Sequence, residues 1–243
     1  MIILSVNAGS SSLKFTGFEM PSEDVLISGV FERIGIDNSF YTIKVNGEKI
    51  KKEVELPNHK VAFEILIKEL MDNKIVESLD EIKGVGHRVV HGGDKYADST
   101  IINKHVTDTI RELFHLAPLH NPANLMGIEA FQEYIPEAPN VAVFDTGFPQ
   151  SMPEESYTYA IPYEWTKKYG ARKYGFHGIS HEYLTETMKK ELGKEDINLI
   201  TCHLGNGSSI FAIKDGKCFD TSLGFSTNSG LVMGTRCGDI DAF

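Results

Sequence analysis

The sequence predicts an α/β protein with two domains, and three features of the chain lead to that prediction. Short apolar segments typical of strands alternate with longer segments whose apolar residues recur at helical spacing. Two-residue turn signals join several of the strands. The segment 145–153, DTGFPQSMP, is rich in glycine and proline and marks a domain boundary. We therefore expect one domain over residues 1–150 and another over residues 151–243.

Composition narrows the class of protein. At 243 residues, with 41% hydrophobic and 24% charged side chains, the chain resembles an ordinary globular protein. Its net charge of −10 argues against a surface for nucleic acid or anionic membranes, because both need clustered positive charge. No apolar run approaches the ~18 residues of a membrane span, and the first residues lack the basic flank of a secretory signal. We expect a cytoplasmic protein without a nucleic-acid or membrane partner, in which any anion is bound locally.

The first half of the chain is predicted to begin with five strands. They cover residues 2–6, 13–18, 25–31, 40–45 and 50–56. Asn46-Gly47 is a hairpin turn between the last two. Helices follow around Phe63 to Leu70 and around Val106 to Phe114. Between these helices, residues 84–90 are predicted as a buried strand that leaves the charged tip of GHRVVHGG in a loop.

The second half continues the same alternation. Residues 140–144 form a short apolar strand, and apolar residues from Ile179 to Leu192 recur at helical spacing. A strand over 198–202 follows. The last two strands, 209–213 and 218–221, are joined by a turn at Asp215-Gly216.

Two strand–turn–strand segments share an unusual turn composition. The first is LSVNAGSSSLKF and the second is ITCHLGNGSSIFAI. Either turn alone is more often just a turn. As a pair facing each other across a cleft, they can present backbone N–H groups and hydroxyls to one polyanion, and Lys14 adds a positive charge. The sequence therefore predicts a site for the phosphates of a nucleotide.

Seven motifs carry a resemblance to a known family. NAGSSSLKF, GHRVVHGG, APLHNP, FDTGFP, RKYGFHGISH, HLGNGSS and MGTRCGDID occur in the order and spacing of the acetate kinases, which are part of the acetate and sugar kinase, Hsc70 and actin superfamily. The resemblance covers essentially the whole chain. It implies a ribonuclease-H-like (actin-like ATPase) fold, with one complete domain plus the beginning of a second, nucleotide-binding domain.

The same resemblance implies an activity and its partners. The reaction is reversible transfer of the ATP γ-phosphoryl group to acetate, giving acetyl phosphate and ADP. The implied metal is Mg²⁺, with Mn²⁺ as an alternative, and the full-length family forms homodimers. Phosphoryl transfer needs in-line placement and positive charge or donors around the equatorial oxygens.

Four residues are expected to act on the transferring group. By resemblance, Arg88 and Arg236 at the tips of two loops grip the carboxylate and the phosphoryl group, as a guanidinium fork can. His177 donates a hydrogen bond to the transferring group. Asp145 ends a buried strand and orients the acetate or the metal, since acetate is already ionised at pH 7 and needs no base.

The remaining site residues carry over by their place in the motifs. Phosphate contacts are expected from Ser10, Ser12 and Lys14 in the first segment, and from His203, Leu204, Gly205, Asn206 and Gly207 in the second. Asn7 matches a residue that meets Mg²⁺ or the phosphates. Val90, Leu119 and Phe176 match a small acetate pocket with His120 beside it, although ordinary core packing also explains these apolar residues. A structural or solvent-facing role is expected for His59, His87, His91, His105, His115 and His181.

Two departures from the family pattern leave alternatives open. STNSG, residues 226–230, stands where the family has Thr-Pro-Leu-Glu-Gly, so that Thr227 replaces a proline of the acetate pocket and Ser229 a carboxylate. The sequence stops at Phe243, where family members continue, and we expect a truncated second domain whose hairpin strands expose apolar faces. The alternatives are a non-catalytic fragment that binds phosphate or an acyl phosphate, and a relative that phosphorylates propionate or butyrate.

Overall fold

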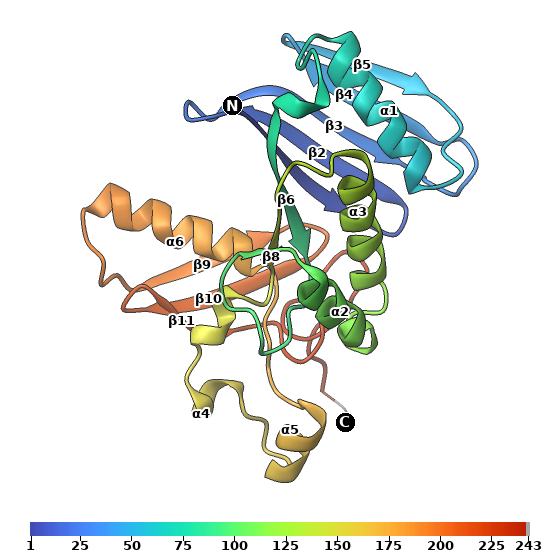
Figure 1. The fold of residues 1–243 in the computed structure, drawn as a ribbon. Helices are drawn as coiled ribbons and strands as arrows, with labels where there is room; N and C mark the ends of the chain where they lie inside the picture. The colour runs from blue at the N-terminus through green and yellow to red at the C-terminus, as the bar shows by residue number, and fades with distance from the viewer. Residues whose placement is uncertain (242–243) are drawn as a thin grey trace. The chain divides into compact units, whose positions relative to one another are not determined.

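The computed structural model describes residues 1–241, and the chain forms two compact units (Figure 1). The first unit contains residues 1–89 and 100–143, and the second contains residues 90–99 and the chain from Phe144 onward. Each unit combines a β-sheet with helices, which confirms the predicted mixed α/β class. The domain division at residue 150 stays a prediction.

The first unit is built on an eight-stranded sheet with the order β5-β4-β3-β2-β1-β6-β8-β7. Its strands are β1 (Ile2–Ala8), β2 (Ser12–Glu19), β3 (Asp24–Glu32), β4 (Phe40–Val45), β5 (Glu48–Glu53), β6 (Ile82–Val89), β7 (Thr100–Ile101) and β8 (Asn140–Phe144). Strands β1 to β5 pair antiparallel in succession, and β6 runs parallel to β1. The sheet is therefore mixed, with the hairpins on one side and the crossover strand on the other.

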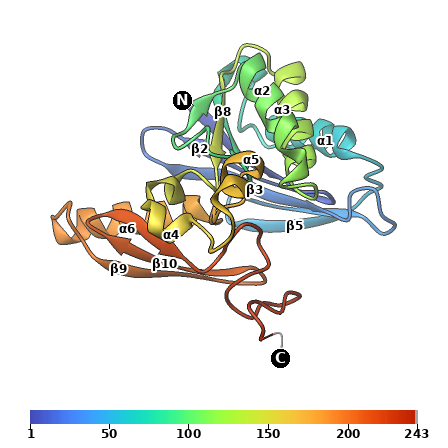
Figure 2. The same cartoon turned by 90° about the horizontal axis from the view of Figure 1, so that it is seen from below.

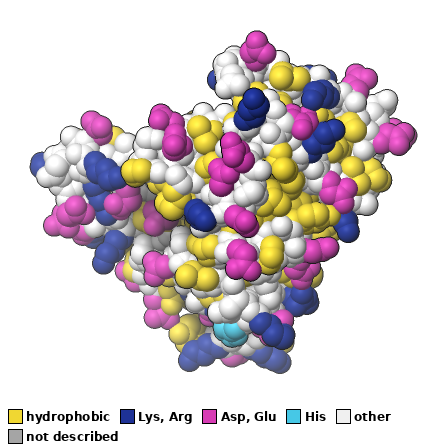
Figure 3. Space-filling view, turned by 45° about the horizontal axis from the view of Figure 1, so that its top comes forward, with side chains coloured by type: hydrophobic (Ala, Val, Ile, Leu, Met, Phe, Trp, Pro, Cys, Tyr) yellow, Lys and Arg dark blue, Asp and Glu magenta, His cyan; other side chains and the backbone are white. Residues whose placement is uncertain are grey.

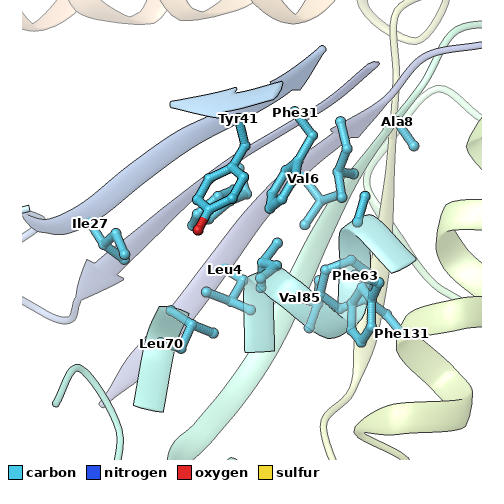
Figure 4. Packing of buried hydrophobic residues seen from close by; sticks show 14 of the residues in the cluster. Leu4, Val6, Ala8, Ile27, Phe31, Tyr41, Phe63, Leu70, Val85 and Phe131 are labelled. Atoms are coloured by element: carbon cyan, nitrogen blue, oxygen red, sulfur yellow. The ribbon is translucent and has the colours of Figure 1, made fainter. Parts of the chain in front are cut away.

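Helices cover one face of this sheet. They are α1 (His59–Asp72), α2 (Lys104–Glu112) and α3 (Asn121–Tyr134), with short 3₁₀ turns η1 (Leu79–Glu81) and η2 (Leu113–His115). Figure 4 shows Leu4 and Val6 of β1 directed at α1 and α3, where Phe63 meets Phe131 edge-on with ring centroids 4.2 Å apart. Alternate β1 residues are buried in this core, so the intervening residues lie on the opposite face of the sheet.

The two-residue turns fix the strand register. Asn46 and Gly47 both have positive φ, 51° and 80°, as a type I′ hairpin turn requires. Val45 therefore pairs directly with Glu48, and β5 begins at Glu48 instead of residue 50 as we predicted. Asp215 and Gly216 form the equivalent turn in the second unit, with φ of 51° and 72°.

Helix α3 is absent from the sequence-based prediction. Its buried face includes Asn121, Asn124 and Gly127, which dilute the apolar pattern that identifies a helix. Gly127 is required by packing, because a Cβ there would lie 2.8 Å from the Cβ of Ala8. The helix thus approaches β1 more closely than any larger residue would permit.

The second unit contains a three-stranded sheet with the order β11-β10-β9. Its elements are η3 (Phe148–Ser151), α4 (Glu154–Tyr157), α5 (Tyr163–Tyr169), α6 (Gly178–Leu192), β9 (Leu199–Leu204), β10 (Ser208–Lys214) and β11 (Lys217–Thr221). Helix α6 lies along β9 and β10 (Figure 2) and contacts the face that carries Phe211. On the other face of β9, Ile200 and Leu204 are 69% and 70% exposed. Strand β9 therefore exposes apolar side chains on this face.

The surface mixes charges of both signs. On the face shown in Figure 3, Lys and Arg side chains are interspersed with Asp and Glu, and no large basic patch is visible there. Within residues 1–241, no helix has the length and apolar character that a membrane crossing requires.

His87 makes the stability of the first unit depend on pH. It lies on β6 with its ring packed edge-on against Phe131, and Nε2 donates to Asn140 Oδ1 at 2.7 Å. Burial lowers the pKa of His87 to about 4 from the ordinary 6.5, although the bond to Asn140 opposes the shift. In the unfolded chain His87 is therefore protonated below about pH 6.5, whereas in the folded chain it is protonated only below about pH 4.

We predict that His87 makes the free energy of unfolding fall as the pH is lowered from 6.5 to about 4, by up to about 1.4 kcal/mol per pH unit. Urea denaturation followed by circular dichroism at pH 7, 6 and 5 measures the slope. His87→Gln keeps a donor for Asn140 but does not titrate. The slope of its unfolding free energy against pH should therefore be shallower by up to about 1.4 kcal/mol per pH unit, which corresponds to one proton. Equal slopes in the two proteins would contradict the assignment.

Candidate active site

The first glycine-rich turn connects β1 to β2 and is held from behind by two buried side chains. Ala8 pairs with Leu13, and the N–H of Gly9 donates to the carbonyl of Ser12 at 2.7 Å. Asn124 Nδ2 donates to the Ala8 carbonyl, and His59 Nε2 to the Gly9 carbonyl, both at 2.7 Å. The carbonyl groups that open the turn are thus bonded to the protein interior.

A polar strip crosses three strands beside this turn. Asn7 of β1 is the direct partner of Lys14 on β2, and residues opposite one another on paired strands share a face. On the other side, Val6 pairs with His87 of parallel β6, which brings Arg88 next to Asn7. Arg88 Nη1 donates to Asn7 Oδ1 at 3.3 Å. An amide therefore lies between two cationic side chains on the face of the sheet away from the core.

The position of Arg88 corrects one expectation. We predicted it at the tip of a loop, whereas it is the penultimate residue of β6. Pairing with β1 continues as far as His87, so the ladder fixes the backbone from which Arg88 projects. A strand holds a side chain more rigidly than a loop tip does.

The other predicted residues of the first unit are more dispersed. Ser10 is exposed in the turn and Ser12 begins β2. Leu119 and His120 immediately precede α3, and Leu119 is 74% exposed. Within its own unit, Leu119 is therefore part of the surface and not of a closed apolar pocket.

The second glycine-rich turn connects β9 to β10. Leu204 pairs with Ser208, and the N–H of Gly205 donates to the carbonyl of Gly207 at 3.1 Å. A later loop packs on this turn, because the N–H of Gly234 donates to the Asn206 carbonyl at 3.1 Å. The turn is therefore fixed at both of its ends and along one side.

A histidine and an arginine converge on this turn. A Cβ at Gly207 would lie 3.3 Å from His177 Nε2 and 3.5 Å from Arg236 Nη1. Arg236 Nη1 also donates to the Thr227 carbonyl at 3.0 Å, which fixes the guanidinium. The His177 ring stacks on His203, with centroids 4.2 Å apart and an interplanar angle of 24°. Side chains from two segments of the chain thus lie beside one glycine.

The backbone at His177 is strained and tightly packed. His177 has φ 64° and ψ 19°, a left-handed conformation that is uncommon outside glycine, immediately before α6. The N–H of Gly178 donates to the Asp145 carbonyl at 2.9 Å, and a Cβ at Gly178 would overlap that oxygen. Asp145, which is 2% exposed, therefore packs against the start of α6.

Two of the predicted pocket residues are buried in the second unit. Val90 and Phe176 are 3% and 2% exposed. The ring of Phe176 lies 5.6 Å, centroid to centroid, from His91, which also packs against Tyr174. These contacts make Phe176 part of an aromatic cluster within the unit.

Thr227 and Ser229, which depart from the motif pattern, both take part in local hydrogen bonds, Thr227 through its backbone carbonyl and Ser229 through its side chain. The Thr227 carbonyl accepts from Arg236, and Ser229 Oγ accepts the N–H of Gly224 at 2.7 Å. Neither contact needs the proline or the carboxylate that these residues replace in the resembled family.

Four residues that support the site, His59, Asn124, His181 and Ser209, were not predicted as part of it. Asn124 lies on helix α3, which the prediction lacks, and the prediction includes Ser209 only as part of a strand. His181 was expected to be structural or solvent-facing; it is buried, and Ser209 Oγ lies 2.8 Å from both His181 Nε2 and His177 Nδ1. The spacing of His177 and His181, one helical turn apart, was the available signal.

Comparison with known proteins gives a consistent result. The model of the acetokinase family matches residues 2–243. An acetate kinase from Bacillus mycoides is 58% identical over 241 residues, covering 98% of this chain and 61% of the relative. The chain thus spans about three fifths of the length of that relative.

Solved structures agree with this match. The Porphyromonas gingivalis acetate kinase has a TM-score of 0.93 at 46% identity, over 99% of this chain and 62% of that chain. A propionate kinase from Francisella tularensis has a TM-score of 0.94 at 46% identity, with the same coverage. These similarities confirm the predicted fold class over the length that is shared.

The anchoring of the first turn can be tested without a ligand. We predict that Asn124→Ala lowers the local opening free energy at Gly9 to Ser12 by about 1–3 kcal/mol, because it leaves the buried Ala8 carbonyl unpaired. Amide hydrogen exchange measures this opening. Asn103→Ala removes the side-chain cap of α2 in the same unit and should leave exchange at the turn unchanged. Unaltered exchange in Asn124→Ala would show that the turn does not depend on this bond.

Proposed function

The chain belongs to the acetokinase family, and we propose on that basis that it provides the phosphate-binding and acetate-binding part of an acetate kinase. The proposed reaction is reversible transfer of the γ-phosphoryl group of ATP to acetate, with acetyl phosphate and ADP as products. The resemblance also suggests a homodimer in the cytoplasm for the whole protein. The convergence of His177 Nε2 and Arg236 Nη1 on the second glycine-rich turn is the observation that carries the proposal.

This arrangement suits the chemistry of phosphoryl transfer. Little covalent work falls to the protein, and catalysis depends on placement and on charge stabilisation around the transferring group. Gly207 lets the backbone approach an anionic ligand closely, while the Arg236 guanidinium supplies a planar set of donors. His177 adds a donor from a third segment of the chain. We propose that this set binds the transferring phosphoryl group.

The polar strip of the first unit suits the same anionic ligands. Lys14 and Arg88 flank Asn7 on one face of the sheet, beside a turn that carries Ser10 and Ser12. We propose that Arg88 binds the acetate carboxylate and the phosphoryl group, while the turn binds phosphate oxygens through backbone N–H groups and hydroxyls.

A divalent metal fits these residues. Within residues 1–241, no group of three His, Cys, Asp or Glu side chains is placed to hold a metal by itself. Mg²⁺ in phosphoryl-transfer sites usually keeps several waters and binds through one or two protein oxygens plus substrate phosphates, so the amide oxygen of Asn7 is a suitable ligand. When bound, Mg²⁺ or Mn²⁺ neutralises charge on the β- and γ-phosphate oxygens.

Asp145 is proposed to orient the acceptor. A buried carboxylate is costly unless it is bonded or has a function, and Asp145 is 2% exposed beside the start of α6. Acetate is already ionised at pH 7, so this carboxylate need not remove a proton. We assign it to orientation of the acetate or of the metal.

From their places in the family motifs, we propose Val90, Leu119, His120 and Phe176 as residues that contact the acceptor. Two of these apolar residues are buried and one is exposed within its own unit. A propionate kinase is among the structural relatives, so a longer acid is the natural alternative acceptor.

A non-catalytic binding module is the second candidate function. Ile200 and Leu204 leave an apolar strand face exposed, which suits a chain that binds a partner. In that case the chain binds phosphate or acetyl phosphate without turnover.

We predict that Arg88→Ala and Arg236→Ala each reduce kcat at least about 10²-fold and weaken ATP binding far less, because both act on the transferring group. Formation of ADP from ATP, acetate and Mg²⁺ in a coupled assay measures this effect. The assay uses this chain and a chimera completed with the remaining part of the Bacillus mycoides relative.

Arg111→Ala is the matched control, since Arg111 lies on the surface and forms ion pairs with Asp108 and Glu129. Near-parental rates in either site variant of an active chimera would contradict the assigned role. An inactive parental chimera that still binds acetyl phosphate would favour the binding module.

We predict that propionate is used with a kcat/KM about 10–200-fold below that of acetate, because one extra methylene in an apolar pocket is worth about 1–3 kcal/mol. A series of acetate, propionate and butyrate in the same assay measures the preference. A higher kcat/KM for propionate than for acetate would favour a propionate kinase.

A further inference from the structure

A chain of buried hydrogen bonds leads from the middle of β9 to the ring of His177. Thr201 Oγ1 lies 2.7 Å from His181 Nδ1, and Ser209 Oγ lies 2.8 Å from His181 Nε2. The same Ser209 oxygen lies 2.8 Å from His177 Nδ1. Thr201, His181 and Ser209 are all buried, at 6%, 0% and 0% exposure. Each of these distances is short enough for a well-formed hydrogen bond.

The central ring of this chain is fixed and neutral. The His181 ring stacks on Phe211, with centroids 3.8 Å apart and an interplanar angle of 9°. Burial, with a smaller effect of the neighbouring His177 and His203, lowers the pKa of His181 to about 3. At pH 7 the ring therefore carries one proton and can donate from only one nitrogen.

The number of protons available determines which group donates in each of these hydrogen bonds. If Thr201 donates to His181 Nδ1, then His181 Nε2 donates to Ser209 and Ser209 donates to His177 Nδ1. All three bonds form, and every buried proton has an acceptor. In the opposite arrangement, His177 Nδ1 donates to Ser209, Ser209 donates to His181 Nε2, and His181 Nδ1 donates to Thr201. The hydroxyl proton of Thr201 then has no acceptor among these groups. The Thr201 hydroxyl has no second hydrogen-bond partner among residues 1–241, so that arrangement buries an unsatisfied donor.

We propose that Thr201, His181 and Ser209 form a one-way hydrogen-bond relay that places the single ring proton of His177 on Nε2. This is the nitrogen near Gly207, so the relay turns His177 into a fixed, neutral N–H donor directed at the second glycine-rich turn. His181 is a positioning residue in this arrangement, since it acts through Ser209. Use of that donor toward a phosphoryl group rests on the proposed function, whereas the relay itself does not.

Nitrogen NMR tests the relay on the chain without any substrate. In protein labelled with ¹⁵N-histidine, long-range ¹H–¹⁵N correlation spectra at pH 7 distinguish the protonated ring nitrogen from the bare one, and His177→Gln and His181→Gln assign the signals. We expect a proton on Nε2 and a bare Nδ1 in both rings. A proton on Nδ1 of His177, on both of its nitrogens, or averaged between them would overturn the proposal.

Two variants of Thr201 test where the direction comes from. Thr201→Val keeps the shape of the side chain and removes the hydroxyl, so the relay loses its first donor. The His177 nitrogens should then show averaged shifts from both tautomers. Thr201→Ser keeps the hydroxyl and should give the parental spectrum. Parental His177 shifts in Thr201→Val would overturn the proposal.

The relay can still be tested if Thr201→Val does not fold or if the chimera is inactive. If Thr201→Val does not fold, the spectrum of the unmodified chain alone decides, because the reverse direction predicts the opposite proton position in both rings. Absence of turnover in the chimera would count against the proposed function and would leave these spectra unchanged.

Discussion

Both candidate phosphate turns depend on a backbone that is held in place by hydrogen bonds from other segments of the chain. A short connection between antiparallel strands has few hydrogen bonds of its own, and each carbonyl or N–H that faces inward needs a partner. In the first unit Asn124 and His59 supply those partners for Ala8 and Gly9. In the second unit, the backbone of Gly234 supports Asn206. These contacts fix the backbone of both turns.

The same principle extends from the backbone to the side chains. Arg236 is fixed by the Thr227 carbonyl, and Arg88 extends from a strand whose ladder with β1 continues to the neighbouring residue. His177 is fixed by Ser209 on one edge and by stacking against His203 on one face. In general, side chains that are fixed in advance lose less entropy when they bind a ligand.

Strain and close packing accompany this arrangement. The left-handed backbone at His177 is maintained by the bond between Gly178 and Asp145, and Gly178 leaves no room for a side chain. Gly127 allows α3 to approach β1, which in turn brings Asn124 to the first turn. Two glycines far apart in the sequence thus serve the same purpose, which is to let one element approach another more closely than a Cβ would permit.

The sequence by itself determined the fold class, nearly all of the strands and the identity of both glycine-rich turns, because these follow from local periodicity and from turn chemistry at Asn46-Gly47 and Asp215-Gly216. It also singled out His177 and Arg236, which the structure brings together at Gly207. Only the tertiary structure decided what supports these residues. Helix α3 was missed because its buried face mixes asparagine and glycine with apolar residues, and β5 was placed late because the two-residue turn sets its start. Likewise, Asn124, Ser209 and His181 act through contacts with residues distant in the chain, and hydrogen bonds of that kind leave no periodic signal in a sequence.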